Sequence, residues 1–329
     1  MTRRTFRELR KRTDAPPGSA WGLWGDDDQC GTVNLLTPER VLAGAGSIRE
    51  GLLFPLDIPL DAFDPALVKT RGSPIHAIEW SDDRLSDRLD DYYLQNTTQI
   101  DGLRHVRHPD FGFYNGVPDA DVTEGTAALG IQNWAQHGLV GRGVLVDVAR
   151  HLANAGMAFD PTTARAITLA ELTATIEAQG SELRPGDMLL LRTGWLASVL
   201  GQSDEQRMRF RGSMASAGLE QSEDLLAWLW DEQFSVVAAD NLAVEVFPVP
   251  EDSPFVLESE RRSGLRTAQR GMLHRMVIPL LGMALGELWN FEELARHCAA
   301  TATWDCMVVA CPLALVGGVG SPANAIAIK

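Results

Sequence analysis

The chain has 329 residues, 45% of them hydrophobic, with 30 glycines and 17 prolines, so it can bury a large core without long disordered tracts. Its formal net charge of −15 repels phosphate backbones and anionic lipid surfaces, which argues against nucleic acid and membranes as partners. No run approaches the roughly 18 apolar residues of a membrane helix, and no apolar signal-peptide core follows the basic N-terminus.

The cysteines and the lack of linkers bear on compartment and domain organisation. The four cysteines lack metal-site spacing and are typical of reduced thiols acting as small hydrophobes, so we expect a cytoplasmic protein; they are Cys30, Cys298, Cys306 and Cys311. No stretch rich in proline, serine or charge divides the chain after the first residues. We therefore expect an N-terminal extension over residues 1–20 and a single domain over residues 21–329.

The first predicted elements are a loop-rich segment and a polar strand. Residues 13–38 place Trp21 and Trp24 among Gly and Asp residues, as in an ordered loop. If residues 95–101 form a strand, alternate residues from Gln95 to Asp101 project from one face. Polar strand faces are commonly solvent-exposed, so this pattern alone favours exposure to water. The alternative is a polar cleft, over which His105 would return after the Asp101-Gly102 turn.

Strand and helix patterns alternate between residues 140 and 240. Buried strands are predicted at 143–148, 188–192 and 235–239, and helices at 168–178 and 222–232. Thr168 and Glu171 have the spacing of a capping box at the start of the first helix. The C-terminal part breaks this rhythm, because residues 307–311, 313–316 and 323–328 are β-rich and joined by Gly-Gly-Val-Gly at 317–320. These features predict an α/β fold with a mixed central sheet, flanking helices and C-terminal β hairpins.

A second group of polar residues lies far along the chain. His274 falls within the apolar run at 271–281, and Glu287 just precedes Leu288-Trp289. An ionised Glu among such neighbours is costly unless it is paired with a charge or a metal. A lone His in an apolar segment is usually a hydrogen-bonded core residue, so these two residues alone do not distinguish a metal site from an ordinary core.

Several blocks of the sequence resemble one known family. They are WGDDDQCGTVNLL at 24–36, GDMLLLRTGW at 186–195, ADNLAVE at 239–245 and PLALVGGVGSP at 312–322. Together they resemble the cyclase family, which contains bacterial kynurenine formamidase, isatin hydrolase and trans-dienelactone hydrolase, from about Trp24 to the C-terminus. The resemblance implies a swivelling β/β/α-type fold, a metal-dependent hydrolase activity, and a homodimer or homotetramer.

The metal motif departs from the family pattern. That pattern resembles His-x-Gly-Thr-His-x-Asp-x-Pro-x-His, and aligning its Asp with Asp101 places its last His on His105. Its first two histidines fall on Gln95 and Gln99. The resemblance also implies a later His and Glu as ligands, and these map onto His274 and Glu287. One metal site is therefore expected to be complete, while the second has lost its imidazoles.

The implied ligand set predicts one divalent ion, Zn²⁺ or Mn²⁺. Asp101, His274 and Glu287 offer two carboxylates and one imidazole, with Gln99 as a weak additional amide ligand. Such an ion lowers the pKa of water and polarises a carbonyl. His105 is then the expected general base, which takes a proton from water and returns it to the leaving atom.

The substrate side is less determined. We expect Gln95, His76 and Tyr114 to contact the substrate, together with Trp24, which could equally fasten its own segment to the core. The predicted function is hydrolysis of an amide, imide or lactone in a small cyclic or aromatic substrate. The alternatives are a metal-dependent lyase or dehydratase using the same site, and a non-catalytic ligand-binding relic.

Overall fold

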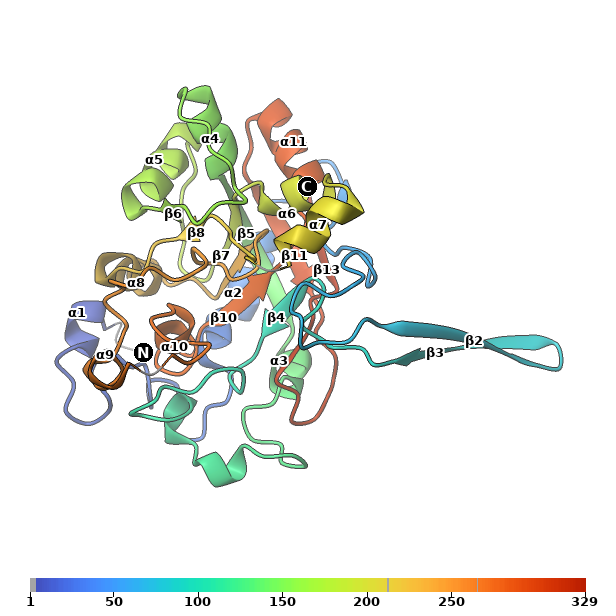
Figure 1. The fold of residues 1–329 in the computed structure, drawn as a ribbon. Helices are drawn as coiled ribbons and strands as arrows, with labels where there is room; N and C mark the ends of the chain where they lie inside the picture. Colours follow the sequence, from blue (N-terminus) through green and yellow to red (C-terminus); the bar gives the residue numbers. More distant parts are fainter. Residues whose placement is uncertain (1–3, 212, 265) are drawn as a thin grey trace.

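The computed structural model describes residues 4–211, 213–264 and 266–329, and residues 1–3 of the expected N-terminal extension lie outside them. A nine-stranded sheet runs through the body in the order β1-β13-β11-β5-β7-β9-β10-β4-β12 (Figure 1). Its strands are β1 (Leu53–Pro55), β4 (Gln99–Asp101), β5 (Leu139–Asp147), β7 (Met188–Arg192), β9 (Val236–Ala239), β10 (Ala284–Glu287), β11 (Asp305–Ala310), β12 (Gly320–Pro322) and β13 (Ala325–Ile328).

The centre of this sheet is parallel and buried. β5, β7, β9 and β10 pair in parallel, and their residues are almost all buried. Continuous Val, Leu and Ala runs suit strands covered on both faces. The predicted strands at 143–148, 188–192 and 235–239 are confirmed here.

The outer strands are antiparallel, which completes the predicted mixed sheet. β11, β13 and β1 extend one side, and β4 and β12 extend the other. The strand predicted at 313–316 is wrong: these residues form a loop between β11 and β12. Pro312 cannot donate to a ladder, and the backbone N–H of Leu313 donates to the side-chain hydroxyl of Ser321 on β12 (2.7 Å) instead of to a backbone carbonyl.

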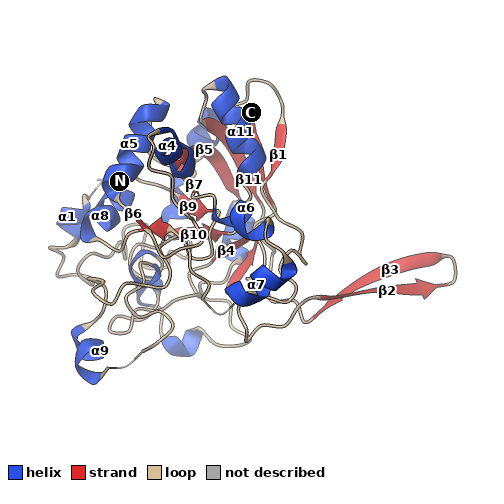
Figure 2. Cartoon of the chain, turned by 45° about the horizontal axis from the view of Figure 1, so that its top comes forward, coloured by secondary structure: helices blue, strands red, loops and turns tan. Residues whose placement is uncertain are grey.

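Helices flank the sheet (Figure 2). Thr168 and Glu171 form the predicted capping box at the start of α5, and Ser222 caps α8 through its hydroxyl. α2 packs on β5 and β11, and α5 on β5. The helices are α1 (Phe6–Leu9), α2 (Pro38–Ala45), α3 (Gln132–His137), α4 (Val148–Asn154), α5 (Leu169–Gln179), α6 (Trp195–Leu200), α7 (Asp204–Phe210), α8 (Glu223–Asp231), α9 (Glu258–Ser263), α10 (His274–Val277) and α11 (Glu292–Thr301).

The described part of the N-terminal segment packs on the body. Phe6 and Leu9 of α1 are buried within the main core, and α1 contacts α8. The Trp230 indole N–H donates to the carbonyl of Arg4 (2.9 Å). This burial fixes α1 against the helices that cover the sheet.

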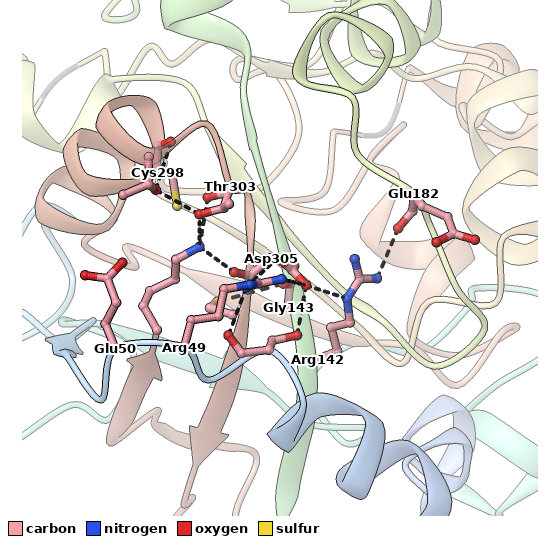
Figure 3. Close-up of polar contacts among 12 residues, drawn as sticks. Arg49, Glu50, Arg142, Gly143, Glu182, Cys298, Thr303 and Asp305 are labelled. Atoms are coloured by element: carbon pink, nitrogen blue, oxygen red, sulfur yellow. Dashed lines mark hydrogen bonds and ion pairs between the residues drawn. The ribbon is translucent and has the colours of Figure 1, made fainter.

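Charged side chains buried beside β5 and β11 are ion-paired or hydrogen-bonded (Figure 3). Arg142 on β5 bonds to the carboxylates of Asp187 (2.7 Å) and Asp305 (3.2 Å). The Lys329 ammonium donates to the carbonyls of Thr303 (2.8 Å) and Asp305 (2.7 Å). Since an unpaired charge in such a place is costly, these contacts hold the C-terminus against the sheet.

Two further features concern the thiols and the surface. All four cysteines are free thiols; Cys298 and Cys306 are buried, whereas Cys311 is exposed. No helix among the described residues has the length and apolarity needed to span a bilayer.

A separate two-stranded sheet of β2 (Ile75–Ser81) and β3 (Arg84–Asp90) extends away from the body (Figures 1 and 2). β6 (Ala166–Ile167) pairs with β8 (Gly218–Leu219).

Candidate metal centre

Three ligand-type side chains from distant parts of the sequence meet beside β4. Asp101 ends β4, Glu287 ends the neighbouring β10, and His274 begins α10. One potential ligand atom from each lies within 4.8 Å of the other two, and all three residues are buried. The imidazole Nε2 lies 3.1 Å from a Glu287 oxygen and 3.9 Å from an Asp101 oxygen. The arrangement can therefore hold a metal ion.

Strand pairing positions the two carboxylates. In the antiparallel β4–β10 ladder, Gln99 lies opposite Glu287, and Asp101 lies opposite Leu285. Because alternate residues of a strand share a face, Gln99 and Asp101 point to the same side. Gly286 permits this close packing, since a Cβ there would lie 2.6 Å from the Trp289 indole nitrogen and 2.7 Å from the Ala238 side chain.

The strand predicted at 95–101 is shorter in the structure, where β4 spans Gln99–Asp101. Residues 95–98 form turns instead, because their side chains satisfy neighbouring backbone groups. The Thr97 hydroxyl bonds to the Ile58 carbonyl (3.4 Å), and the Thr98 hydroxyl to the Leu288 carbonyl (2.6 Å). The predicted polar face therefore holds for Gln99 and Asp101 but not for the residues before them.

Glu245 orients the imidazole of His274, a role that the sequence did not assign. One of its carboxylate oxygens accepts from His274 Nδ1 (2.6 Å) and from the His274 backbone N–H (3.0 Å). The other accepts from the Leu273 N–H (2.5 Å) and the Gln221 amide (2.6 Å). Metal-binding histidines commonly have such a carboxylate partner on the second ring nitrogen. The sequence feature that could have indicated this role is the position of Glu245 as the acidic residue that ends the ADNLAVE block. In the structure Glu245 is fully buried.

Asp101, His274 and Glu287 are called the cluster below, and its electrostatics favour a cation. Burial alone would lower the pKa of His274, but hydrogen bonds to Glu245 and Glu287 outweigh it and raise the pKa to about 10. Burial and the nearby Asp101 carboxylate raise the pKa of Glu287 to about 7. Three acidic side chains thus surround one imidazole in a desolvated place, where their repulsion is offset by a proton on the ring or by a bound cation that replaces it.

An unpartnered oxygen points to the same conclusion. The Gln99 amide N–H donates to Glu287 (2.6 Å), whereas Gln99 Oε1 is buried without a hydrogen-bond partner among the described residues. A buried oxygen normally has such a partner. The cluster and this amide oxygen together fit a divalent ion that accepts oxygen and nitrogen ligands.

His105 lies at the edge of the cluster. Its Nε2 is 3.8 Å from Asp101, and its Nδ1 is 3.0 Å from the Gln95 amide nitrogen. The same amide also donates to Asp101. Burial lowers the pKa of His105, so the ring is neutral near pH 7 and can accept a proton. The Arg71 side chain, which the sequence did not single out, donates to the Gln95 carbonyl and holds this turn.

The comparisons with known proteins decide the family. The sequence model of the cyclase family matches residues 59–246, more than half of the chain. A crystal structure described as a novel cyclase has a TM-score of 0.80 at 33% identity, covering 94% of this chain and 99% of that one. The chain belongs to the cyclase family. No curated protein sequence matches this cyclase.

More distant solved structures share the fold of this cyclase. Isatin hydrolase A from Ralstonia solanacearum has a TM-score of 0.55 at 14% identity, covering 89% of this chain and 98% of that one. The isatin hydrolase A from Labrenzia aggregata, bound to benzyl benzoate, has a TM-score of 0.53 at 16% identity, with coverages of 88% and 97%. These likenesses confirm the predicted fold class.

The remaining predicted substrate contacts of this cyclase have other partners or lie exposed. Tyr114 is fully buried and donates its hydroxyl proton to Asp28 (2.9 Å). Trp24 packs edge-on against Trp230, with ring centroids 6.1 Å apart. His76 lies exposed on β2. Of the four residues expected to contact substrate, Gln95 alone hydrogen-bonds to Asp101 and His105; roles for the other three stay predictions.

Proposed function

We propose that this cyclase is a metal-dependent hydrolase that opens an amide, imide or lactone bond of a small cyclic or aromatic substrate. The observation that carries the proposal is the buried group of Asp101, His274 and Glu287, whose ligand atoms lie within 4.8 Å of one another. The isatin hydrolases that share the fold are named for hydrolysis of a small cyclic compound, which supports the same substrate class.

In this proposal, Asp101, His274 and Glu287 hold one divalent ion, Zn²⁺ or Mn²⁺, with Gln99 as a weak fourth ligand. When bound, such an ion would supply Lewis acidity that polarises a carbonyl and lowers the pKa of water. Glu245 keeps the His274 ring in one orientation by accepting from its Nδ1 (2.6 Å). Gln99 orients Glu287 through its amide N–H (2.6 Å).

His105 moves the proton. Its neutral ring takes a proton from the attacking water and delivers it to the leaving nitrogen or oxygen. The amide nitrogen of Gln95 can only donate, so its contact with Nδ1 (3.0 Å) makes Nδ1 the acceptor nitrogen and leaves the ring proton on Nε2. Water and Gln95 therefore compete for the same lone pair, and Gln95 must release His105 before the ring can act as base at this nitrogen.

The proposal is tested with metal-depleted protein that is reloaded with Zn²⁺ or Mn²⁺. Cyclic amides, imides, lactones and aryl formamides, and hydroxy acids for the alternative reaction, are supplied in isotopically labelled water, and the products are analysed by mass spectrometry. Hydrolysis places one solvent oxygen in the product, whereas a lyase or dehydratase reaction on a hydroxy acid leaves its product without that label. Ring opening that occurs equally in metal-depleted protein would contradict the proposal.

A further inference from the structure

The hairpin of β2 and β3, here called the arm, has little contact with the rest of the chain. Its two strands form a sheet of their own, and the arm projects well beyond the body (Figures 1 and 2). Seven residues per strand give a reach of roughly 23 Å at about 3.3 Å per residue. The arm could therefore reach a neighbouring molecule.

Strand register divides the arm into two unlike faces. His76 pairs with Leu89, Ile78 with Asp87, and Trp80 with Leu85, and directly paired residues share a face. We call this the apolar arm face; its large apolar side chains are Ile78, Trp80, Leu85 and Leu89, exposed by 58%, 76%, 53% and 39%. The same face also carries His76 and Asp87, whose side chains lie 3.6 Å apart.

The opposite face is mainly polar. There Arg88 forms ion pairs with Glu79 (3.1 Å) and Asp90. A sheet with one apolar and one polar face is the pattern of a sheet packed on one side. An isolated two-stranded hairpin is also marginally stable in water. Both facts indicate that the apolar arm face is covered by another surface when the protein functions.

A matching surface is present on the body of the same chain. The loop between β11 and β12 exposes four apolar side chains, which we call the loop patch: Leu313 (41%), Leu315 (44%), Val316 (67%) and Val319 (41%). Exposed apolar side chains that cluster in this way commonly mark interaction sites. The arm of the same molecule points away from the body and leaves its own apolar face exposed.

We propose that the arm of one molecule packs its apolar face on the loop patch of a second copy, which returns its own arm in the same way. Such a two-fold exchange uses both surfaces twice. Typical side-chain areas give roughly 500 Å² of apolar surface per arm. Two arms and the surfaces that they cover then bury roughly 2,000 Å², which reaches the size of specific interfaces, about 1,200–2,000 Å². The exchange therefore accounts for both exposed surfaces with one partner that is always present.

The exchange would place the interface beside the candidate metal centre. Val319 at the end of the loop patch accepts through its carbonyl from the Gly102 N–H (2.9 Å), and Gly102 follows Asp101. The association itself does not depend on the proposed hydrolysis, so either can fail without the other.

Self-association is measured by light scattering during size-exclusion chromatography. Unaltered protein is expected to elute with the mass of at least two chains. Trp80→Asp should weaken association by at least about 100-fold, as loss of a central aromatic anchor on each of two arms does. Val316→Asp on the loop patch should do the same. Ser86→Asp is the matched control, because it adds the same charge to the polar face of the arm and should leave the mass unchanged.

A photo-crosslinking residue at position 80 identifies the covered surface. The expected product has twice the mass of one chain, and its crosslinked peptide contains residues 313–319. A single-chain mass for unaltered protein at micromolar concentration would overturn the proposal. So would a double-mass product crosslinked at another surface, or unchanged association of both Trp80→Asp and Val316→Asp.

Discussion

The Glu245→Gln substitution probes the part of the centre that sequence reasoning missed. Each carboxylate oxygen of Glu245 accepts two hydrogen bonds: one from Leu273 and Gln221, the other from the backbone and ring of His274. A glutamine has one oxygen and one NH₂ group. In either orientation, its NH₂ faces two donors.

The expected cost follows from this geometry. Each buried donor that loses its acceptor costs about 1–3 kcal/mol, so the free energy of unfolding should fall by about 2–6 kcal/mol. The His274 ring also loses its fixed orientation. Removing such a partner of a metal ligand typically weakens metal binding by about 10- to 100-fold, which corresponds to about 1.4–2.8 kcal/mol.

Titration calorimetry with Mn²⁺ and urea unfolding measure the two effects separately. Asp187→Asn is the matched control, since the Asp187 carboxylate is also buried and accepts from Arg142 and Arg184 (both 2.7 Å), outside the metal-ligand group. The control should lose stability while it keeps its metal affinity. A Glu245→Gln protein that binds Mn²⁺ as tightly as the unaltered chain would refute the assigned role of Glu245.

Three further predictions test the centre. Asp101→Ala should abolish both metal content, measured by plasma mass spectrometry, and turnover; a metal-free variant with full activity would disprove the role of the ion. His105→Ala should keep the ion while the rate falls about 10²- to 10⁴-fold; if the ion leaves with His105, this residue is a ligand. The control is His108→Ala, which removes a histidine that stacks on Phe111 and should leave the rate near that of the unaltered protein. The double change Gln95→His and Gln99→His should raise the metal content from one ion per chain to two, and unchanged stoichiometry would show that these positions do not form a second site.

Much of the central fold could be predicted because its signals are local. The capping box of Thr168 and Glu171 and the apolar runs of β5, β7 and β9 depend on residues close in sequence. The juxtaposition of Asp101 with His274 and Glu287 is different, because it links residues more than 170 positions apart. The family resemblance supplied that expectation, and neither segment alone distinguished a ligand from a core residue.

The errors also have physical causes. Residues 313–316 have strand-forming side chains, but β12 occupies the position beside β4, and the loop remains exposed. Gln95 lies outside the observed strand because the Thr97 and Thr98 hydroxyls donate to backbone carbonyls of other segments. In both cases, contacts with distant parts of the chain determine the local structure, and strand propensity does not reveal such contacts.

The central claim is that one divalent ion binds between Asp101, His274 and Glu287. Anomalous diffraction from crystals grown with Mn²⁺ tests it most directly. We expect one strong peak per chain within coordination distance of all three side chains. A map with no peak there, or with the ion bound at another place, would contradict the claim.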